Sequence, residues 1–291
     1  DAGVKRFDAD SEIADAWYRL TNGTYNQNDI DEEKIVKIEA FINNLKVPFY
    51  EKVRFRIINS QEPSKGEKIG TYGIIKGANI FIAVAYENGE MALEEVGYEM
   101  EKLILYITSL GLGTCWIGGT FNKSEFSKAM DLKSNEILPI VTPIGKSEEK
   151  KRFIERAMKL FAKSKKRKEW CELFFLRDFS MPLTPVINLG YFKEVLENVR
   201  LAPSALNKQP WRIVKDSNKF HFYINSSKIK NDKLTFDIHR IDMGIAMCHF
   251  DLTCREIGLE GRFIKDNPEI ENIPRNTEYV ITWVLGSNYD I

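Results

Sequence analysis

The chain carries an internal repeat, and this feature limits the folds open to it more than any other. Two apolar segments with helical patterning, 94–119 and 241–266, align without a gap at an offset of 147 residues. From 97 to 117, six of 21 aligned pairs are identical, where chance gives about one. The identical pairs begin at Gly97, Met100, Leu105, Gly111, Leu112 and Ile117. Because the offset is close to half of the 291 residues, we expect a duplicated domain; the alternative is two unrelated amphipathic helices.

The predicted elements follow the same order in both halves. Apolar residues at helical spacing and alternating β-branched residues distinguish the helices from the strands. The first half is expected to hold a helix over 31–45, strands over 53–58 and 78–86, the long helix, and a strand over 138–144. The second half repeats this order with a helix over 191–200, strands over 211–214 and 219–224, the long helix, and a strand over 278–285. The order predicts an α+β fold with mixed or antiparallel central sheets and flanking helices.

The repeat also predicts the domain limits. We expect a first half over 1–146, a second half over 191–291, and a connecting segment over 147–190 that wraps the halves. A charged helix is expected over 147–166, with acidic residues suited to its N-terminus. The stretch WCELFF at 170–175 is too apolar for a free linker.

Composition removes several classes of protein. The chain has 42 basic and 42 acidic residues, which disfavours a general nucleic-acid binder. It has no apolar run near the roughly 20 residues of a membrane span and no visible secretory signal, so we expect a cytoplasmic protein. The four cysteines form no CxxC pair and the three histidines no HExxH motif, so no disulfide scaffold or metal site is expected.

The segment LAPSALNKQPW, 201–211, is the most distinctive in the chain. It is predicted to follow a helix and precede a strand, and its prolines and small residues favour a rigid loop. Ser204, Asn207 and Gln209 place hydroxyl and amide groups on this loop, where they could bond the edge of a planar heterocycle. The alternative is a helix cap and turn, with Trp211 in the core.

The segment GLGTCWIGG, 111–119, resembles a dinucleotide-binding loop but closes a helix instead of opening one. Gly111 or Gly113 is therefore expected to end the helix. Gly118 and Gly119 would leave backbone N–H groups open to a ligand. The second repeat has Lys265 and Asp266 at these positions, so only one copy could use the glycines.

The basic run KSKKRK, 163–168, allows three interpretations. It could be a solvated helix end, where cations are favourable. It could bind a phosphate, because arginine offers paired donors. A nucleic-acid tail is the third, although no aromatic stacking platform accompanies the run.

Taken together, these segments resemble the FMN-dependent nitroreductases. LAPSALNKQPW matches the family's APS-x-x-N-x-QPW loop, and GLGTCWIGG with the later PIG strand end (143–145) matches a second family segment. The likeness covers nearly all of 17–286 and extends to a subgroup with two fused nitroreductase-like halves in one chain. It therefore implies a nitroreductase-like fold that is internally duplicated.

The resemblance also implies a set of FMN-binding residues. The family's N-terminal phosphate signature falls at Arg19 and Thr21, although Gly23 replaces its second basic residue. The other implied contacts are Arg167 and Lys168 for phosphate, Gly70 and Thr71 at the pyrimidine edge, Gly118 and Gly119 at flavin N5, and Ser204, Asn207 and Gln209 on the ring. No catalytic side chain is implied.

The implied activity is NAD(P)H-driven, ping-pong reduction of a nitroaromatic, quinone or similar small-molecule acceptor. One FMN per chain would be held between the two halves, and NADH or NADPH would be the electron donor. Because the two halves of one chain would form an internal pseudo-dimer, the protein would be a monomer. Two alternatives remain open: an FMN-binding sensor or store without turnover, and a different flavin reaction such as dehalogenation or flavin breakdown.

Overall fold

The computed structural model describes residues 30–60, 77–119, 121–146, 166–225 and 236–286. They form two compact units. The first is drawn from Asp1–Lys46, Glu51–Ala92 and Met100–Lys150, and the second from Val47–Tyr50, Leu93–Glu99 and Lys151–Ile291. Two short stretches from the first half of the sequence, 47–50 and 93–99, thus belong to the second unit.

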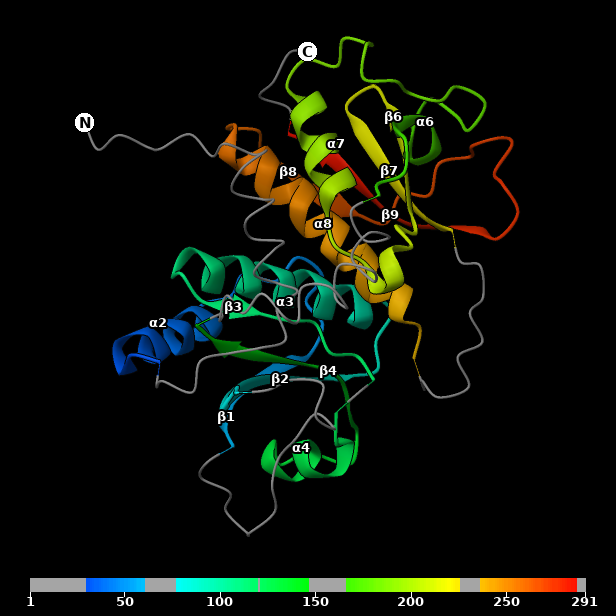
Figure 1. Ribbon diagram of the computed structural model, residues 1–291. Helices are drawn as coiled ribbons and strands as arrows, with labels where there is room; N and C mark the ends of the chain where they lie inside the picture. Colours follow the sequence, from blue (N-terminus) through cyan, green and yellow to red (C-terminus); the bar gives the residue numbers. More distant parts are fainter. Residues whose placement is uncertain (1–29, 61–76, 120, 147–165, 226–235, 287–291) are drawn as a thin grey trace, which may run out of the picture. The chain divides into compact units, whose positions relative to one another are not determined.

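The first unit is built on an antiparallel sheet with the strand order β1-β2-β4-β3 (Figure 1). Its strands are β1 (Val53–Asn59), β2 (Ile80–Glu87), β3 (Gly113–Thr114) and β4 (Glu136–Gly145). The helices in this part of the sequence are α2 (Glu32–Asn43), α3 (Ala92–Ser109) and α4 (Lys123–Ala129). Figure 1 shows α3 and α4 on opposite faces of the sheet.

Strand β2 is buried on both of its faces because helices cover the sheet on each side. Phe81, Ala83 and Ala85 share one face and join Phe126 of α4 in a hydrophobic cluster. Ile82 and Val84 point to the other face and are equally buried. This double burial explains why the sequence of β2 is continuously apolar instead of alternating.

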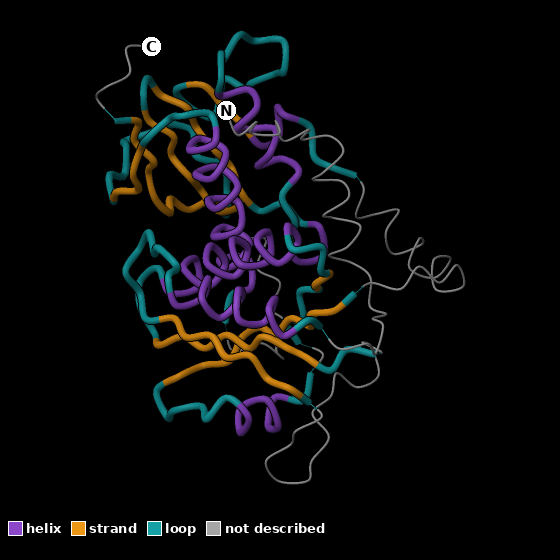
Figure 2. Tube along the Cα trace, turned by 90° about the vertical axis from the view of Figure 1, so that its left-hand side faces the viewer, coloured by secondary structure: helices purple, strands orange, loops and turns teal. Residues whose placement is uncertain are grey.

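The second unit is built on a mixed sheet with the order β5-β6-β7-β9-β8. Its strands are β5 (Phe174–Leu176), β6 (Trp211–Asp216), β7 (Lys219–Asn225), β8 (Gly261–Ile264) and β9 (Thr277–Leu285). β5 pairs with β6 in parallel, and the other pairings are antiparallel. The helices are α6 (Trp170–Leu173), α7 (Phe192–Leu201), α8 (Ile238–Glu256) and the 3-10 turn η1 (Ala205–Asn207). Figure 2 shows the strands in orange and the helices in purple.

An aromatic cluster fastens α7 and α8 to this second sheet. The ring of Phe220 in β7 lies 4.6 Å from that of Phe192 in α7, 4.9 Å from that of Phe250 in α8, and 6.1 Å from that of Trp283 in β9. All four side chains are buried. Aromatic pairs at these separations contribute about 0.5–1.5 kcal/mol each beyond their buried area.

The two sheets share one topology. When strands are counted from the start of each half, β1-β2-β4-β3 and β6-β7-β9-β8 have the same order, with β5 added at an edge of the second sheet. The long helices α3 and α8 connect equivalent strands. This correspondence supports the duplication predicted from the sequence repeat, and the predicted α+β class is confirmed.

The two long helices also end in the same way. Gly111 after α3 and Gly258 after α8 have left-handed φ angles of 75° and 78°. In each case the N–H of the following leucine bonds back to a carbonyl five residues earlier, at 3.3 Å after α3 and 2.8 Å after α8. These are Schellman motifs, so Gly111 ends a helix as predicted and does not open a nucleotide loop.

Three sequence predictions concern the connecting segment 147–190 and its limits. Nearly all of the charged helix expected over 147–166 falls outside the described residues. The apolar stretch 170–176 forms α6 and β5, and Trp170, Leu173 and Phe174 are buried in the second unit. The limits at 146/147 and 190/191 stay a prediction, because the compact units exchange short stretches of chain.

Candidate functional site

The distinctive loop 202–210 connects α7 to β6, as the sequence predicted. It contains three residues with left-handed backbone: Leu206 (φ 52°), Asn207 (φ 53°) and Gln209 (φ 46°). Such angles are unusual for residues other than glycine, and most costly for a residue such as leucine. A strained loop of this kind persists only where surrounding contacts enforce it.

Those contacts come from the segment 166–169. The Oε1 atom of Gln209 accepts the backbone N–H of Lys168 at 2.8 Å, and Nδ2 of Asn207 donates to the carbonyl of Lys166 at 2.8 Å. Arg167 donates from Nη1 to Oδ1 of Asn207 and from Nη2 to the carbonyl of Leu201, both at 3.0 Å. Hydrogen bonds therefore join the loop to the end of the basic run.

Within the loop, the side chains also bind one another. Oγ of Ser204 accepts the backbone N–H of Gln209 at 2.9 Å. Nε2 of Gln209 donates to the carbonyl and to Oδ1 of Asn207, both at 3.1 Å. Gln209 is only 2% exposed. Its amide therefore bonds the loop and the segment 166–169 in this structure, and the ring contacts of Ser204, Asn207 and Gln209 stay predictions.

Basic side chains gather at this loop. Burial, together with the charges of Arg212 and Lys208, lowers the pKa of Lys168 to about 8, against a smaller opposing effect of Glu172. Burial also lowers the pKa of Arg167 to about 10, with a smaller effect from Arg200. Across the described parts of the chain, neither Lys168 nor Arg212 forms an ion pair. Within the described residues, the site thus carries partly buried positive charge, and Glu172 is the acidic residue that raises the pKa values of Lys168 and Arg212.

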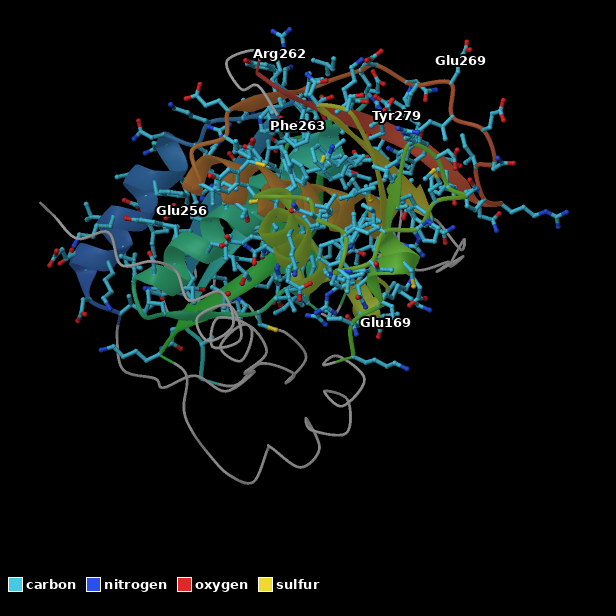
Figure 3. All side chains as sticks on the ribbon, turned by 90° about the horizontal axis from the view of Figure 1, so that it is seen from above. Glu169, Glu256, Arg262, Phe263, Glu269 and Tyr279 are labelled. Atoms are coloured by element: carbon cyan, nitrogen blue, oxygen red, sulfur yellow. The ribbon has the colours of Figure 1, made fainter. Side chains whose placement is uncertain are left out.

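Figure 3 labels Glu169, which ends the segment 166–169 and begins α6. Its backbone N–H donates to Oε2 of Glu172 at 3.0 Å, so this acidic pair caps α6. Glu197 accepts Nε1 of Trp170 at 2.8 Å and pairs with Arg200. These nearby carboxylates are therefore committed to the helices.

The structure brings together five predicted site residues: Arg167, Lys168, Ser204, Asn207 and Gln209. All five belong to the second unit. Gly118 and Gly119 belong to the first unit, where they follow Ile117, whose N–H and carbonyl both bond to Val141 at 3.0 Å. Gly118 is partly exposed and Gly119 exposed, as a backbone donor site would require. Arg19, Thr21, Gly70 and Thr71 lie outside the described residues.

Three residues at the site escaped sequence reasoning. Arg212 donates from Nη1 to the carbonyls of Gln209 and Trp211, at 3.1 Å and 2.6 Å. Asp242 and His239, near the start of α8, form a buried pair beneath the loop. Their spacing of three on a helix was a visible signal, but nothing in the sequence connected it to residues 204–209. Trp211 itself is fully buried in the core.

A comparison with protein-family models identifies the chain. The family described as "Putative TM nitroreductase" matches residues 18–254, which is most of the sequence. The chain belongs to this nitroreductase family. A protein from Thermotoga maritima, solved as a "putative nitroreductase", is 20% identical with a TM-score of 0.52, covering 97% of this chain and 98% of its own. This nitroreductase-family chain therefore shares that protein's fold over its full length.

Single-domain relatives match about half of this nitroreductase-family chain. A nitroreductase with bound FMN from Bacteroides fragilis is 19% identical, with a TM-score of 0.37, covering 48% of this chain and 90% of its own. An FMN-dependent nitroreductase from Clostridium difficile is 18% identical, with a TM-score of 0.37, covering 46% and 88%. A comparison with curated proteins found no match. Within the described residues, no helix is both long and apolar enough to span a membrane.

Proposed function

We propose that the chain is an FMN-dependent oxidoreductase that uses NADH or NADPH to reduce a nitroaromatic, quinone or similar acceptor. Membership of the nitroreductase family supports this class of activity. Proteins that match about half of the chain include one described as an FMN-dependent nitroreductase and one described as a "Putative NADH Oxidase". The proposal is for one FMN per chain, because only one copy of each predicted contact segment is retained: the amide-bearing loop in the second repeat and the glycine pair in the first.

Two partly buried cations beside the loop, which form no ion pair with any described residue, are the observation on which the proposal rests. Lys168 and Arg212 are partly buried, and burial lowers their pKa values. Among the described residues, Glu172 is the carboxylate that favours their charged forms. An arrangement of this kind is stabilised by an anion. The phosphate of FMN is such an anion, so the donor set fits the cofactor.

This cluster of cations and the family resemblance support the following proposed roles. Lys168 and Arg212 would hold the phosphate, and Arg167 would position the loop while adding positive charge. Ser204 and Asn207 would face the ring, and Gly118 and Gly119 would offer backbone N–H groups. Arg19, Thr21, Gly70 and Thr71 keep the FMN contacts implied by the family resemblance.

FMN would supply the redox chemistry, taking a hydride from the nicotinamide and passing two electrons to the acceptor. The protein's part is to bind and orient the cofactor and to leave one side open to donor and acceptor in turn. No side-chain general acid or base is needed for that exchange. Because one chain supplies both repeats, we also propose that the protein is a monomer.

The deciding experiment measures FMN affinity for two lysine variants. Lys168→Gln removes a partly buried charge, while Lys166→Gln removes an exposed charge two residues earlier and serves as its control. If Lys168 makes a charge-assisted bond to phosphate, its loss costs roughly 1.5–3 kcal/mol, or at least about tenfold in Kd. Lys166→Gln should change Kd by less than about twofold, because exposed charges contribute little.

Arg167→Ala is a poorer probe. Its guanidinium holds Asn207 and the carbonyl of Leu201, so its removal would disturb the loop as well as the charge. Failure of the wild-type protein to bind FMN, or equal affinities for the two lysine variants, would contradict the proposal. Stopped-flow mixing with NADH and NADPH then separates turnover from storage: FMN that binds but is reduced by neither indicates a sensor or store.

A further inference from the structure

Asp242 connects the candidate site to helix α8. It lies in the first turns of α8 and is 2% exposed. Its Oδ1 atom accepts the backbone N–H of Ala205 at 2.8 Å, and its Oδ2 atom lies 2.9 Å from Nδ1 of His239. One carboxylate oxygen thus holds the loop, and the other holds a histidine that is itself 5% exposed.

Ala205 is the point at which this hold matters most. It begins the turn η1 and follows Ser204, which has extended backbone, while Leu206 next in line is left-handed. The backbone therefore changes conformation sharply at Ala205. A fixed N–H at this position determines how the chain enters the strained segment that carries Asn207 and Gln209.

The first repeat contains the same kind of anchor, a carboxylate on the long helix that accepts a backbone N–H, but it lacks the histidine. At the offset of 147 residues, Glu95 corresponds to Asp242. Oε2 of Glu95 accepts the backbone N–H of Phe49 at 3.0 Å, and Phe49 precedes β1 as Ala205 precedes β6. Both anchors lie in the second unit. The residue that corresponds to His239 is Ala92, so the histidine is found only in the repeat that retains the amide-bearing loop.

We propose that His239 and Asp242 form a positioning pair that holds the loop 204–209 in its strained conformation, and that the charge on His239 determines how firmly the loop is held. Its consequence for FMN binding rests on the function proposed above. The pair does not touch the reacting atoms in this scheme; it acts through Ala205.

The groups around His239 set the sign of its pH dependence. Asp242 raises the pKa of His239 against the opposing effect of burial, and the net shift is upward. Asp237 at the helix N-cap adds to the rise, and Lys208 on the loop opposes it. Burial raises the pKa of Asp242. When His239 loses its proton, its ring can still donate a hydrogen bond to Asp242, but the ion pair is lost and a buried carboxylate is left without a compensating charge. The hold on the loop therefore weakens as pH rises through the pKa of His239.

Hydrogen exchange at single amides tests the pair in the full chain without added FMN. Asp242→Asn should reduce the protection of the Ala205 amide by about tenfold or more, because an acceptor charge is lost. Glu95→Gln is the matched control: it should expose the Phe49 amide while leaving Ala205 protected. Unchanged protection of Ala205 in Asp242→Asn would overturn the proposal.

A second variant separates positioning from simple packing. His239→Asn places an amide nitrogen near the position of Nδ1, so it keeps a neutral donor but cannot titrate. Protection of Ala205 should fall with rising pH near neutrality in the wild-type protein, and should be flat in His239→Asn. Equal pH profiles for the two proteins would overturn the role of the histidine charge, and this variant also decides the matter if Asp242→Asn does not fold.

FMN affinity completes the test. Asp242→Asn should weaken FMN binding by about tenfold, whereas Glu95→Gln should leave it unchanged. If the wild-type chain binds no FMN, the proposed function fails, but the exchange results still decide whether the pair holds the loop. If Asp242→Asn exposes Ala205 without weakening FMN, the link between the pair and the cofactor is wrong.

Discussion

Gly97 of α3 and Gly244 of α8 pack against each other's helix backbones in a reciprocal contact. A Cβ atom on Gly97 would overlap the carbonyl oxygen of Ile241, and one on Gly244 would overlap that of Glu94. Glu94 and Ile241 are themselves related by the repeat offset of 147 residues. Each copy therefore presents the same surface to the other, as in an isologous dimer contact, and both surfaces lie within the second unit.

We expect Gly97→Ala and Gly244→Ala to destabilise the protein by similar amounts. The added methyl group meets backbone, which cannot rotate away, so overpacking should cost about 1–3 kcal/mol despite alanine's better helix propensity. Chemical denaturation of the two variants checks both the size and the equality of the losses. A neutral or stabilising effect in either variant would mean that the helices separate readily.

Gly111→Ala provides the contrast. No described residue has an atom within 4 Å of a Cβ atom placed at Gly111, so the left-handed φ of 75° is what opposes alanine. The expected cost is about 1–2 kcal/mol from backbone conformation alone. If Gly111→Ala costs about as much as the other two variants, double variants distinguish overpacking from backbone strain. The losses of Gly97→Ala and Gly244→Ala should be non-additive when combined, and Gly111→Ala should add to either of them.

The reciprocal contact also shows how far the sequence alone could lead. Identity at Gly97 and Gly244 revealed the repeat, and apolar spacing located most helices and strands, because both signals are local. The sequence did not reveal β5, since a three-residue strand pairing in parallel with a distant partner has no pattern of its own.

At the candidate site, too, the sequence revealed local motifs but not the contacts between distant residues. Lys168 and Asn207 could be proposed from motifs, but their shared hydrogen-bonded cluster depends on contacts across some forty residues of chain. The pairing of Asp242 with the N–H of Ala205 was invisible for the same reason. Periodicity reports which face of an element is buried, and says nothing about which loop a buried carboxylate will meet.

Glu136 should give the protein an acid-sensitive component of stability. Arg54 binds this carboxylate through two hydrogen bonds, at 2.9 Å and 2.6 Å, and lowers its pKa to about 2. A lowered pKa means that the stabilisation is complete above the unfolded value of 4.5 and is lost as pH falls toward 2. We expect Glu136→Gln to lose about 1 kcal/mol at pH 7, since solvent at Arg54 screens the pair.

The check is the free energy of unfolding between pH 7 and pH 2.5. The difference between wild type and Glu136→Gln should shrink over this range. Glu33→Gln, which removes an exposed pair with Lys37, is the control and should show little difference at any pH. A difference that stays constant with pH would show that Glu136 acts through packing.

Leu206 offers a site where a substitution should stabilise the protein. Its backbone is left-handed at φ 52°, and its side chain is 82% exposed, so leucine contributes strain and little packing. Asparagine tolerates this conformation, and Leu206→Asn should gain about 1 kcal/mol by thermal unfolding. Val186→Asn is the control: Val186 is 90% exposed without a left-handed φ, so no gain is expected there. No gain at Leu206 would show that the loop relaxes without cost.

Lys168 should make the FMN-free protein more stable at alkaline pH. Burial lowers its folded-state pKa to about 8, against 10.5 for an unperturbed lysine. Between these two values the unfolded chain binds a proton that the folded chain has released. Stability must therefore rise with pH from about 8 to about 10.5, opposite to the behaviour of a lysine in an ion pair.

Urea unfolding at pH 7.5, 8.5 and 9.5 tests this sign. The wild-type protein should gain stability across the series relative to Lys168→Gln, whereas Lys166→Gln should follow the wild type. Saturating FMN should remove the gain, because a bound phosphate would hold Lys168 in its charged form and restore its pKa. A wild-type profile parallel to that of Lys168→Gln in the FMN-free protein would show that the Lys168 ammonium reaches solvent, and the anion site would lose its main support.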